Sequence, residues 1–191
     1  MKKKIFIITS SRADYSLLFL TFKKLNQDKR YDTKLIAAAS HNSKKFGNTF
    51  EFIKKDKIKI YKKIILKSRV NNPLEVCSSI SFHITQLSKI LKKDRPDLVI
   101  LLGDRYETLS FAIACHYLKM KVAHIGGGDI TEGSLDNQTR FAISNLSNIH
   151  FATNQFSKNI LKKKLLINKN VYDVGSPGVE LIKKTNFINK K

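Results

Sequence analysis

The chain has 191 residues, of which 42% are hydrophobic, and a formal net charge of +21. This length is typical of a single domain with one hydrophobic core. No apolar stretch approaches the roughly 18 residues of a membrane span, and the run after the basic start, residues 5–8, is too short for a signal peptide. The composition therefore excludes a membrane-spanning protein and predicts a cytoplasmic one.

The positive charge comes almost entirely from lysine, because only six of the 36 basic residues are arginine. Many lysines stand in pairs such as Lys23-Lys24 and Lys92-Lys93, as is typical of solvated helix ends and faces. A nucleic-acid reader favours the forked contacts of arginine, and no recognition motif for nucleic acid occurs. We expect neither a nucleic acid nor a membrane as partner, and a basic nucleic-acid-binding domain is kept as an alternative.

Short apolar runs alternate with segments of helical period along the chain. The runs predict seven strands, at residues 4–10, 33–39, 59–66, 97–103, 121–126, 149–153 and 171–175. Helices are predicted between them, at residues 15–25, 73–93, 106–119, 135–146 and 155–165. Several runs are apolar almost throughout, as strands covered on both faces require. The alternation predicts an α/β fold with a doubly wound, Rossmann-like parallel sheet.

Proline marks both ends of the longest predicted helix. Pro73 stands in its first turn, where the missing N–H costs nothing, and Pro96 disfavours the helical conformation at Arg95. No linker rich in Pro, Gly or Ser interrupts the pattern. We therefore expect one domain over residues 1–182, followed by a basic tail at residues 183–191.

The cysteines and histidines give no sign of a metal site. Cys77 and Cys115 lie far apart in predicted helices and are expected to be buried free thiols. No pair of histidines has metal-ligand spacing, and neither common glycine-rich nucleotide motif occurs. We expect no metal and no cofactor.

Polar residues follow several predicted strands, and ligands gather at such strand ends in doubly wound sheets. After the first strand, Asp14 suits the first turn of a helix, or Arg12 binds a phosphate beside free helix N–H groups. After the fourth strand, Asp104 either caps a helix or lies at a cleft next to Arg105. His41 follows the second strand. The sequence leaves these alternatives open.

The stretch "HIGGGDITEGSLDNQTR", residues 124–140, contains three consecutive glycines and three acids. Glycine weakens a strand, so the run predicts a backbone that passes close to a ligand. Ser134 is expected to cap a helix with Asp136 in its first turn and Arg140 on the same face. Asp129 and Glu132 fall in a loop, where they suit general acid/base chemistry.

Motifs along the chain resemble those of one enzyme family. The stretches "SSRADYSLL", "SHNSKKFGNTF", "RPDLVILLGDRYETL", "AHIGGGDITEGSLDNQTRFAISNLSNIHF" and "VGSPGVELI" are similar to the hydrolysing UDP-N-acetylglucosamine 2-epimerases of sialic-acid and related nonulosonic-acid pathways. The likeness runs in order from about residue 4 to residue 182. The RADY and GDRYE stretches distinguish this group from the non-hydrolysing epimerases.

The resemblance implies one half of a two-domain, glycosyltransferase-B-like enzyme with its active site between the domains. Such an enzyme removes the C2 proton of the sugar while UDP leaves, forms a 2-acetamidoglucal, and adds water. The matching positions put Arg12 near the diphosphate and make Asp104 and Asp136 active-site carboxylates. His124 and Arg140 also align with the motif. As a strand residue, His124 is otherwise expected to be a satisfied core histidine.

The chain departs from the family pattern at Gly126, where Glu or His is common. Asp129 is then the expected carboxylate in its place, and the glycine is compatible with a variant sugar such as a bacillosamine derivative. Family members are roughly twice as long, and their second domain supplies most uridine contacts. A UDP-sugar substrate and either a homodimer or a separate C-terminal half are therefore the expected partners. A non-catalytic nucleotide-sugar-binding domain is the alternative.

In total, the candidate catalytic residues are Asp104, Asp129, Glu132 and Asp136, and the candidate substrate-binding residues are Arg12, His41, Arg105, His124 and Arg140.

Overall fold

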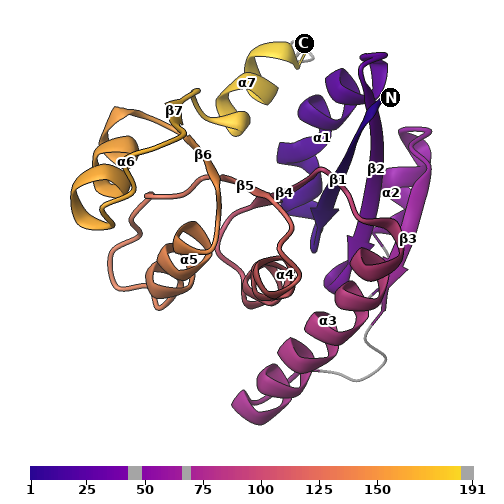
Figure 1. Ribbon diagram of the computed structural model, residues 1–191, viewed down its shortest axis with the longest axis horizontal. Coiled ribbons are helices and arrows are strands. Elements are labelled where there is room, and N and C mark those ends of the chain that lie inside the picture. The colour runs from indigo at the N-terminus through magenta and orange to yellow at the C-terminus, as the bar shows by residue number, and fades with distance from the viewer. Residues whose placement is uncertain (43–48, 66–69, 186–191) are drawn as a thin grey trace, which may run out of the picture.

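The computed structural model describes residues 1–42, 49–65 and 70–185. Its centre is a parallel sheet of seven strands in the order β3-β2-β1-β4-β5-β6-β7 (Figure 1). The strands are β1 (Lys3–Thr9), β2 (Tyr31–Ala38), β3 (Ile60–Ile64), β4 (Leu98–Leu102), β5 (Val122–Ile125), β6 (Ile149–Ala152) and β7 (Val171–Asp173). Each begins within two residues of its predicted start, and the predicted doubly wound α/β fold is confirmed.

The direction of strand addition reverses between β1 and β4. From β1 the chain adds β2 and β3 on one side, then crosses to β4 and continues to β7 on the other side. Connections on the two sides of this switch point diverge and leave a crevice at the carboxyl ends of the strands. The topology thus fixes where a ligand site is expected.

Helices surround the sheet. They are α1 (Arg12–Gln27), the 3-10 helix η1 (Ala39–Asn42), α2 (Phe50–Lys55), α3 (Pro73–Asp94), α4 (Tyr106–Tyr117), α5 (Asp136–Asn145), α6 (Gln155–Asn159), the π-helix η3 (Ile160–Lys164) and α7 (Pro177–Lys184). The segment predicted as one helix over residues 155–165 is divided into α6 and η3. The helices α2 and α7 were not predicted, since few turns give little periodicity.

The two faces of the sheet build separate hydrophobic clusters, and β1 contributes to both. Phe6 and Ile8 pack with side chains of α3, α4 and α5, whereas Ile5 and Ile7 pack with α1 and α2. Successive side chains of a strand point to opposite faces. A strand with helices on both sides must therefore be apolar at every position, which explains the continuous apolar runs.

The structure corrects one of the two cysteine predictions. Cys115 is buried in α4, and burial raises the pKa of its thiol to about 12. Cys77 is exposed on α3. The buried side of α3 is the row of every fourth residue from Ser79 to Leu91, and Cys77 does not fall on it. The predicted burial of Cys77 is therefore wrong.

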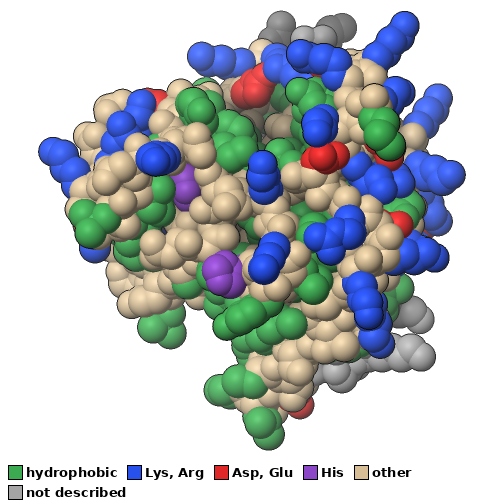
Figure 2. All heavy atoms as spheres, viewed as in Figure 1, with side chains coloured by type: hydrophobic (Ala, Val, Ile, Leu, Met, Phe, Trp, Pro, Cys, Tyr) green, Lys and Arg blue, Asp and Glu red, His purple; other side chains and the backbone are tan. Residues whose placement is uncertain are grey.

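Figure 2 shows lysine and arginine side chains spread over much of the face in view, with other atoms between many of them, whereas Arg140 is buried. Among the described residues, no helix combines the length and apolar character needed to cross a bilayer. Helix α7 ends at Lys184, and residues 186–191 of the predicted basic tail lie outside the described residues. The predicted domain limit at residue 182 stays a prediction.

Candidate active site

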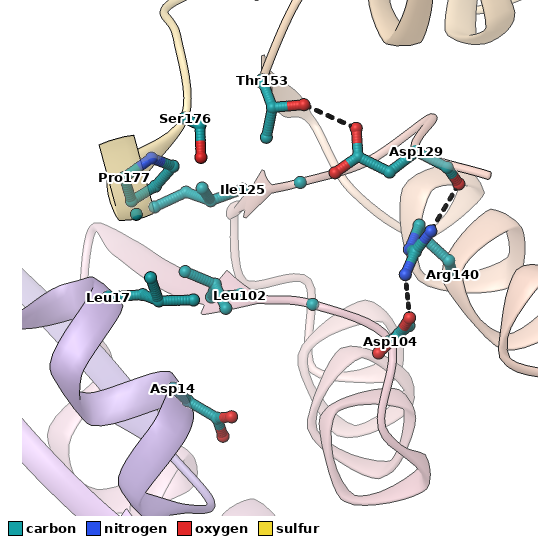
Figure 3. Close-up of a pocket in the computed structure, with 13 residues that line it drawn as sticks. Asp14, Leu17, Leu102, Asp104, Ile125, Asp129, Arg140, Thr153, Ser176 and Pro177 are labelled. Carbon is teal, nitrogen blue, oxygen red and sulfur yellow. Dashed lines mark hydrogen bonds and ion pairs between the residues drawn. The ribbon is translucent and has the colours of Figure 1, made fainter. Parts of the chain in front are cut away.

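A cavity of about 300 Å³ opens at the carboxyl edge of the sheet, beside the switch point (Figure 3). Residues that end or follow five different strands line it. They are Asp14 and Leu17 after β1, Leu102, Gly103 and Asp104 at the end of β4, Ile125, Gly126 and Asp129 at the end of β5, Thr153 after β6, Ser176, Pro177 and Gly178 after β7, together with Arg140 of α5. The cavity is therefore where the strand order predicts a ligand site.

Arg140 connects two of the predicted carboxylate residues. Its Nη2 forms an ion pair with the carboxylate of Asp104, and its Nη1 donates to the backbone oxygen of Asp129 at 2.5 Å (Figure 3). Only 11% of the Arg140 side chain is exposed. A buried, hydrogen-bonded ion pair holds its members in one geometry, because separating them leaves an uncompensated charge.

The structure also decides between the two interpretations of Asp104. The residue that precedes the first turn of α4 is Arg105, so Asp104 is not the helix cap. The expected pairing of Asp136 with Arg140 along α5 is also absent, since Asp136 bonds to Ser134. Asp104 is instead a cavity carboxylate, and its partner is the inward-facing Arg140.

The carboxylate of Asp129 is held by hydroxyl groups. Its Oδ1 accepts hydrogen bonds from Thr153 Oγ1 at 2.6 Å and from Ser157 Oγ at 2.5 Å. The other oxygen, Oδ2, is directed toward the cavity (Figure 3). Asp129 therefore presents a carboxylate oxygen to whatever occupies the cavity.

Each of the three consecutive glycines has a structural cause, and at Gly127 a built Cβ would lie 2.7 Å from Ser144 Oγ. Gly126 lines the cavity at a φ of +80°, and a Cβ built there would lie 3.8 Å from Asp129 Oδ2. Gly128 has a φ of +82°, and a Cβ there would lie 2.2 Å from the backbone oxygen of Ser157. Gly128 is thus required by contact with α6, and the predicted close approach of Gly126 to a ligand stays a prediction.

Asp14 is a cavity residue that the sequence analysis left as a helix-terminal acid. Its Oδ2 accepts from the backbone N of Ser10 at 3.0 Å and from the Ser10 hydroxyl, and its Oδ1 accepts from Ser11 Oγ at 2.6 Å. The residue is 8% exposed. Asp14 both stabilises the N-terminus of α1 and forms a wall of the cavity.

The two candidate histidines are buried and do not line the cavity. His124 donates from Nε2 to the backbone oxygen of Gly103 at 2.8 Å, and its Nδ1 accepts from Ser144 Oγ at 3.0 Å. His41 bonds to the hydroxyls of Thr9 at 2.9 Å and Thr49 at 2.7 Å. Burial lowers the pKa of each imidazole to about 4. His124 fixes the end of β4, as expected of a satisfied core histidine.

Four further candidates lie outside the residues that line the cavity. The Arg12 guanidinium lies 4.4 Å from the centre of the Phe52 ring, and Arg105 pairs with the buried Glu107 at 2.9 Å. Glu132 and Asp136 are exposed. The structure therefore brings together Asp104, Asp129 and Arg140, and the roles expected for Arg12, Arg105, Glu132, Asp136 and His41 remain predictions.

Sequence reasoning missed the polar residues after β6 and β7. Thr153 and Ser176 line the cavity. Thr153 is the last residue of one predicted strand and Ser176 follows another, so the strand-end rule could have found them. Ser157 lies inside α6, and no local pattern indicates its contact with Asp129. Among residues 1–42, 49–65 and 70–185, no three His, Cys, Asp or Glu side chains are grouped to hold a metal ion.

The doubly wound parallel sheet, with carboxylates at its switch point, defines an α/β domain whose candidate ligand site lies at the carboxyl ends of its strands. The family model described as UDP-N-acetylglucosamine 2-epimerase matches residues 23–191. The chain belongs to this family.

Two relatives are named for a particular sugar. The GDP/UDP-N,N'-diacetylbacillosamine 2-epimerase (hydrolyzing) of Campylobacter jejuni is 36% identical over 100% of this chain and 49% of its own length. The UDP-N,N'-diacetylbacillosamine 2-epimerase (hydrolyzing) of Legionella pneumophila is 32% identical over 95% of this chain and 48% of its own length. The chain thus spans about half the length of these curated relatives.

A solved structure supports the fold. The UDP-GlcNAc 2-epimerase from Neisseria meningitidis, bound to UDP-GlcNAc, superposes with a TM-score of 0.83 at 21% identity. The match covers 94% of this chain and 48% of that one. The chain therefore has one half of a glycosyltransferase-B-like fold.

The buried histidines predict a loss of stability in mild acid. His41 and His124 titrate at about 6.5 when unfolded and about 4 when folded, so between these values only the unfolded chain takes up protons. The contribution of the neutral histidines to the free energy of unfolding is complete above pH 6.5 and is lost as the pH falls toward 4. At pH 5 the loss is roughly 2 kcal/mol per histidine. Urea unfolding at pH 7 and pH 5 measures this loss.

The matched variants are His41→Gln and His124→Gln, with the exposed His116→Gln as control. The first two should reduce the difference in unfolding free energy between the two pH values, and the control should keep it. An unchanged pH dependence in both buried variants would contradict the assignment.

The contact of Gly128 with α6 predicts a large cost for one added methyl group. Gly128→Ala should lower the free energy of unfolding by roughly 3 kcal/mol, through left-handed strain and overlap with the Ser157 carbonyl. Gly133 also has positive φ but has no atom within 4 Å of a built Cβ. Gly133→Ala should therefore cost only about 1 kcal/mol. Equal losses in urea titrations would refute the packing argument.

Proposed function

We propose that the chain supplies the carboxylate-bearing domain of a hydrolysing UDP-sugar 2-epimerase. Membership of the family and the names of its relatives support this proposal. The observation that carries it is the meeting of Asp104, Asp129 and Arg140 at one cavity. The chain spans about half of those relatives, so a second domain is part of the proposal.

The proposed reaction has two stages. A carboxylate takes the proton from C2 of the sugar, the C1–O bond to UDP breaks with its electron pair leaving on the diphosphate, and a C1=C2 double bond forms. Water then adds its hydroxyl to C1 of this glucal, and C2 receives a proton on the opposite face. The products are UDP and the free 2-epimerised sugar.

In this proposal, Asp129 is the base that removes the C2 proton. Its Oδ2 faces the cavity while its Oδ1 is occupied by hydroxyl donors. Proton transfer by a positioned carboxylate requires such a free oxygen within reach of the substrate. Asp129 Oδ2 lies close to Gly126, the position at which the resembled family commonly carries Glu or His. This position supports the proposal that the Asp129 carboxylate takes the place of that missing side chain.

Asp104 has a different proposed role because it is paired with Arg140. The fixed carboxylate stabilises the positive charge that develops at C1 as UDP departs. Arg140 holds this carboxylate in place. Five further candidate residues would contact the substrate only if the second domain or a change of the loops brought them to it. They are Arg12, His41, Arg105, Glu132 and Asp136.

The proposed substrate is a UDP-linked 2-acetamido sugar, either UDP-N-acetylglucosamine or UDP-N,N'-diacetylbacillosamine. Two relatives act on the latter by name, and Gly126 leaves that part of the cavity wall without a side chain. A further relative is named as a polysialic acid biosynthesis protein. We place the enzyme in cytoplasmic nonulosonic-acid synthesis, with a homodimer or a separate C-terminal half as partner.

The test combines the chain with the separately produced second half of the Campylobacter jejuni relative. Each UDP-sugar is supplied in D₂O, and NMR follows UDP release, the free sugar and deuterium at C2. Asp129→Asn and Asp104→Asn should lower turnover by at least about 100-fold, since each removes a charged group of the reaction. Asp136→Asn is measured alongside.

Asp32→Asn is the matched control, because Asp32 lies at the amino end of β2, away from the cavity. It should leave turnover unchanged. Full turnover in Asp104→Asn and Asp129→Asn would overturn the site assignment. UDP-sugar binding without any turnover by the assembled halves would favour a non-catalytic binding domain instead.

A further inference from the structure

We propose that Thr153 and Ser157 are positioning residues for Asp129, whose Oδ2 they direct into the cavity. The two hydroxyls lie at the junction of β6 and α6, outside the loop that carries Asp129. This inference rests on the proposed function, because it assigns a task to Asp129 at that site. It adds residues that neither the sequence motifs nor the relatives' names point to.

The two hydroxyls converge on a single carboxylate oxygen. Thr153 Oγ1 and Ser157 Oγ donate to Asp129 Oδ1 at 2.6 and 2.5 Å. Two donors on one side fix the rotation of the carboxylate about its last bond, and the second oxygen must then point the other way. In Figure 3 that second oxygen lies on the cavity side of Asp129.

The donors themselves are well fixed. Ser157 is 1% exposed, and its backbone N donates to the side chain of Asn154, the cap of α6, at 2.9 Å. Thr153 Oγ1 also accepts from Asn154 Nδ2 at 3.1 Å. The start of α6 therefore holds both hydroxyls in place before any ligand enters, which is what preorganisation requires.

The loop is brought to α6 by its own backbone. A Cβ at residue 128 would lie 2.2 Å from the Ser157 carbonyl oxygen, so only glycine fits at this contact. In addition, Arg140 Nη1 donates a hydrogen bond to the backbone oxygen of Asp129. Asp129 is thus held at its backbone by α5 and at its side chain by the start of α6. A carboxylate fixed at both ends keeps its free oxygen in one place.

Hydroxyl donors also leave the negative charge of Asp129 available. The Asp104 carboxylate is paired with Arg140, whereas no ion pair of the Asp129 carboxylate occurs among the described residues. A neutral donor orients a carboxylate without cancelling its charge. The free oxygen can then accept a hydrogen bond from a hydroxyl group of a bound sugar ring, or a proton from that ring.

The first test measures binding to this chain by calorimetry with two probes, UDP-N-acetylglucosamine and UDP. Thr153→Val and Ser157→Ala should each weaken UDP-N-acetylglucosamine binding about tenfold, as expected for loss of an oriented charged acceptor. UDP lacks the N-acetylglucosamine ring that would meet Asp129, so its affinity should not change. Thr153→Ser, which keeps the hydroxyl, should restore wild-type affinity.

Thr85→Val is the matched control, because its hydroxyl bonds only to its own helix, at Ser81. It should change neither affinity. If the Thr153 and Ser157 variants bind both probes as the unmodified chain does, the positioning role is refuted. Equal weakening for both probes would indicate a general structural defect and would also contradict it.

A second measurement needs no ligand. The side-chain ¹³C resonance of the Asp129 carboxylate, assigned by its loss in Asp129→Asn, should move in Thr153→Val and Ser157→Ala and stay in place in Thr85→Val. An unmoved resonance in both variants would overturn the inference. If the unmodified chain binds neither probe, the resonance alone decides the positioning of Asp129, because the second domain is part of the proposed function. Absence of binding by the assembled halves would contradict the proposed function itself.

Discussion

The guanidinium of Arg140 joins the chain segments that follow two neighbouring strands, β4 and β5. It bonds to the carboxylate of Asp104 after β4 and to the backbone of the loop after β5, while its own helix leads to β6. The side chain is almost fully buried. Removing one member of such a pair typically costs about 3–5 kcal/mol, so we expect this contact to stabilise the cavity wall.

The contact is possible because the sheet delivers its strand ends to one edge. In a parallel sheet all carboxyl ends lie on the same side, and the reversal of strand order separates the connections above them. His124 then fixes the last residues of β4 through the Gly103 carbonyl. The shape of the cavity at this edge thus depends on buried polar contacts beneath it, where desolvation lowers the pKa of the His124 imidazole to about 4.

Much of the architecture follows from local pattern. Strands buried on both faces must be apolar at every position, so β1, β4 and β5 could be predicted directly, and the search at strand ends led to Asp104 and Asp129. The partner of Arg140 could not be predicted, because helix spacing favours Asp136 and the actual partner is 36 residues away. The contact of Ser157 with Asp129 is equally non-local. Cys77 is exposed and Cys115 is buried because Cys77 lies on the outer side of α3 and Cys115 on the inner side of α4.

The missing side chain at Gly128 has an evolutionary consequence. Since the Ser157 carbonyl occupies the space where a Cβ would be, neither the loop after β5 nor the start of α6 can drift without the other. A lineage that reshapes this pocket for a bulkier ligand must first shift the helix or exchange both segments together. Divergence of substrate preference in such a scaffold should therefore proceed by paired replacements rather than by single steps.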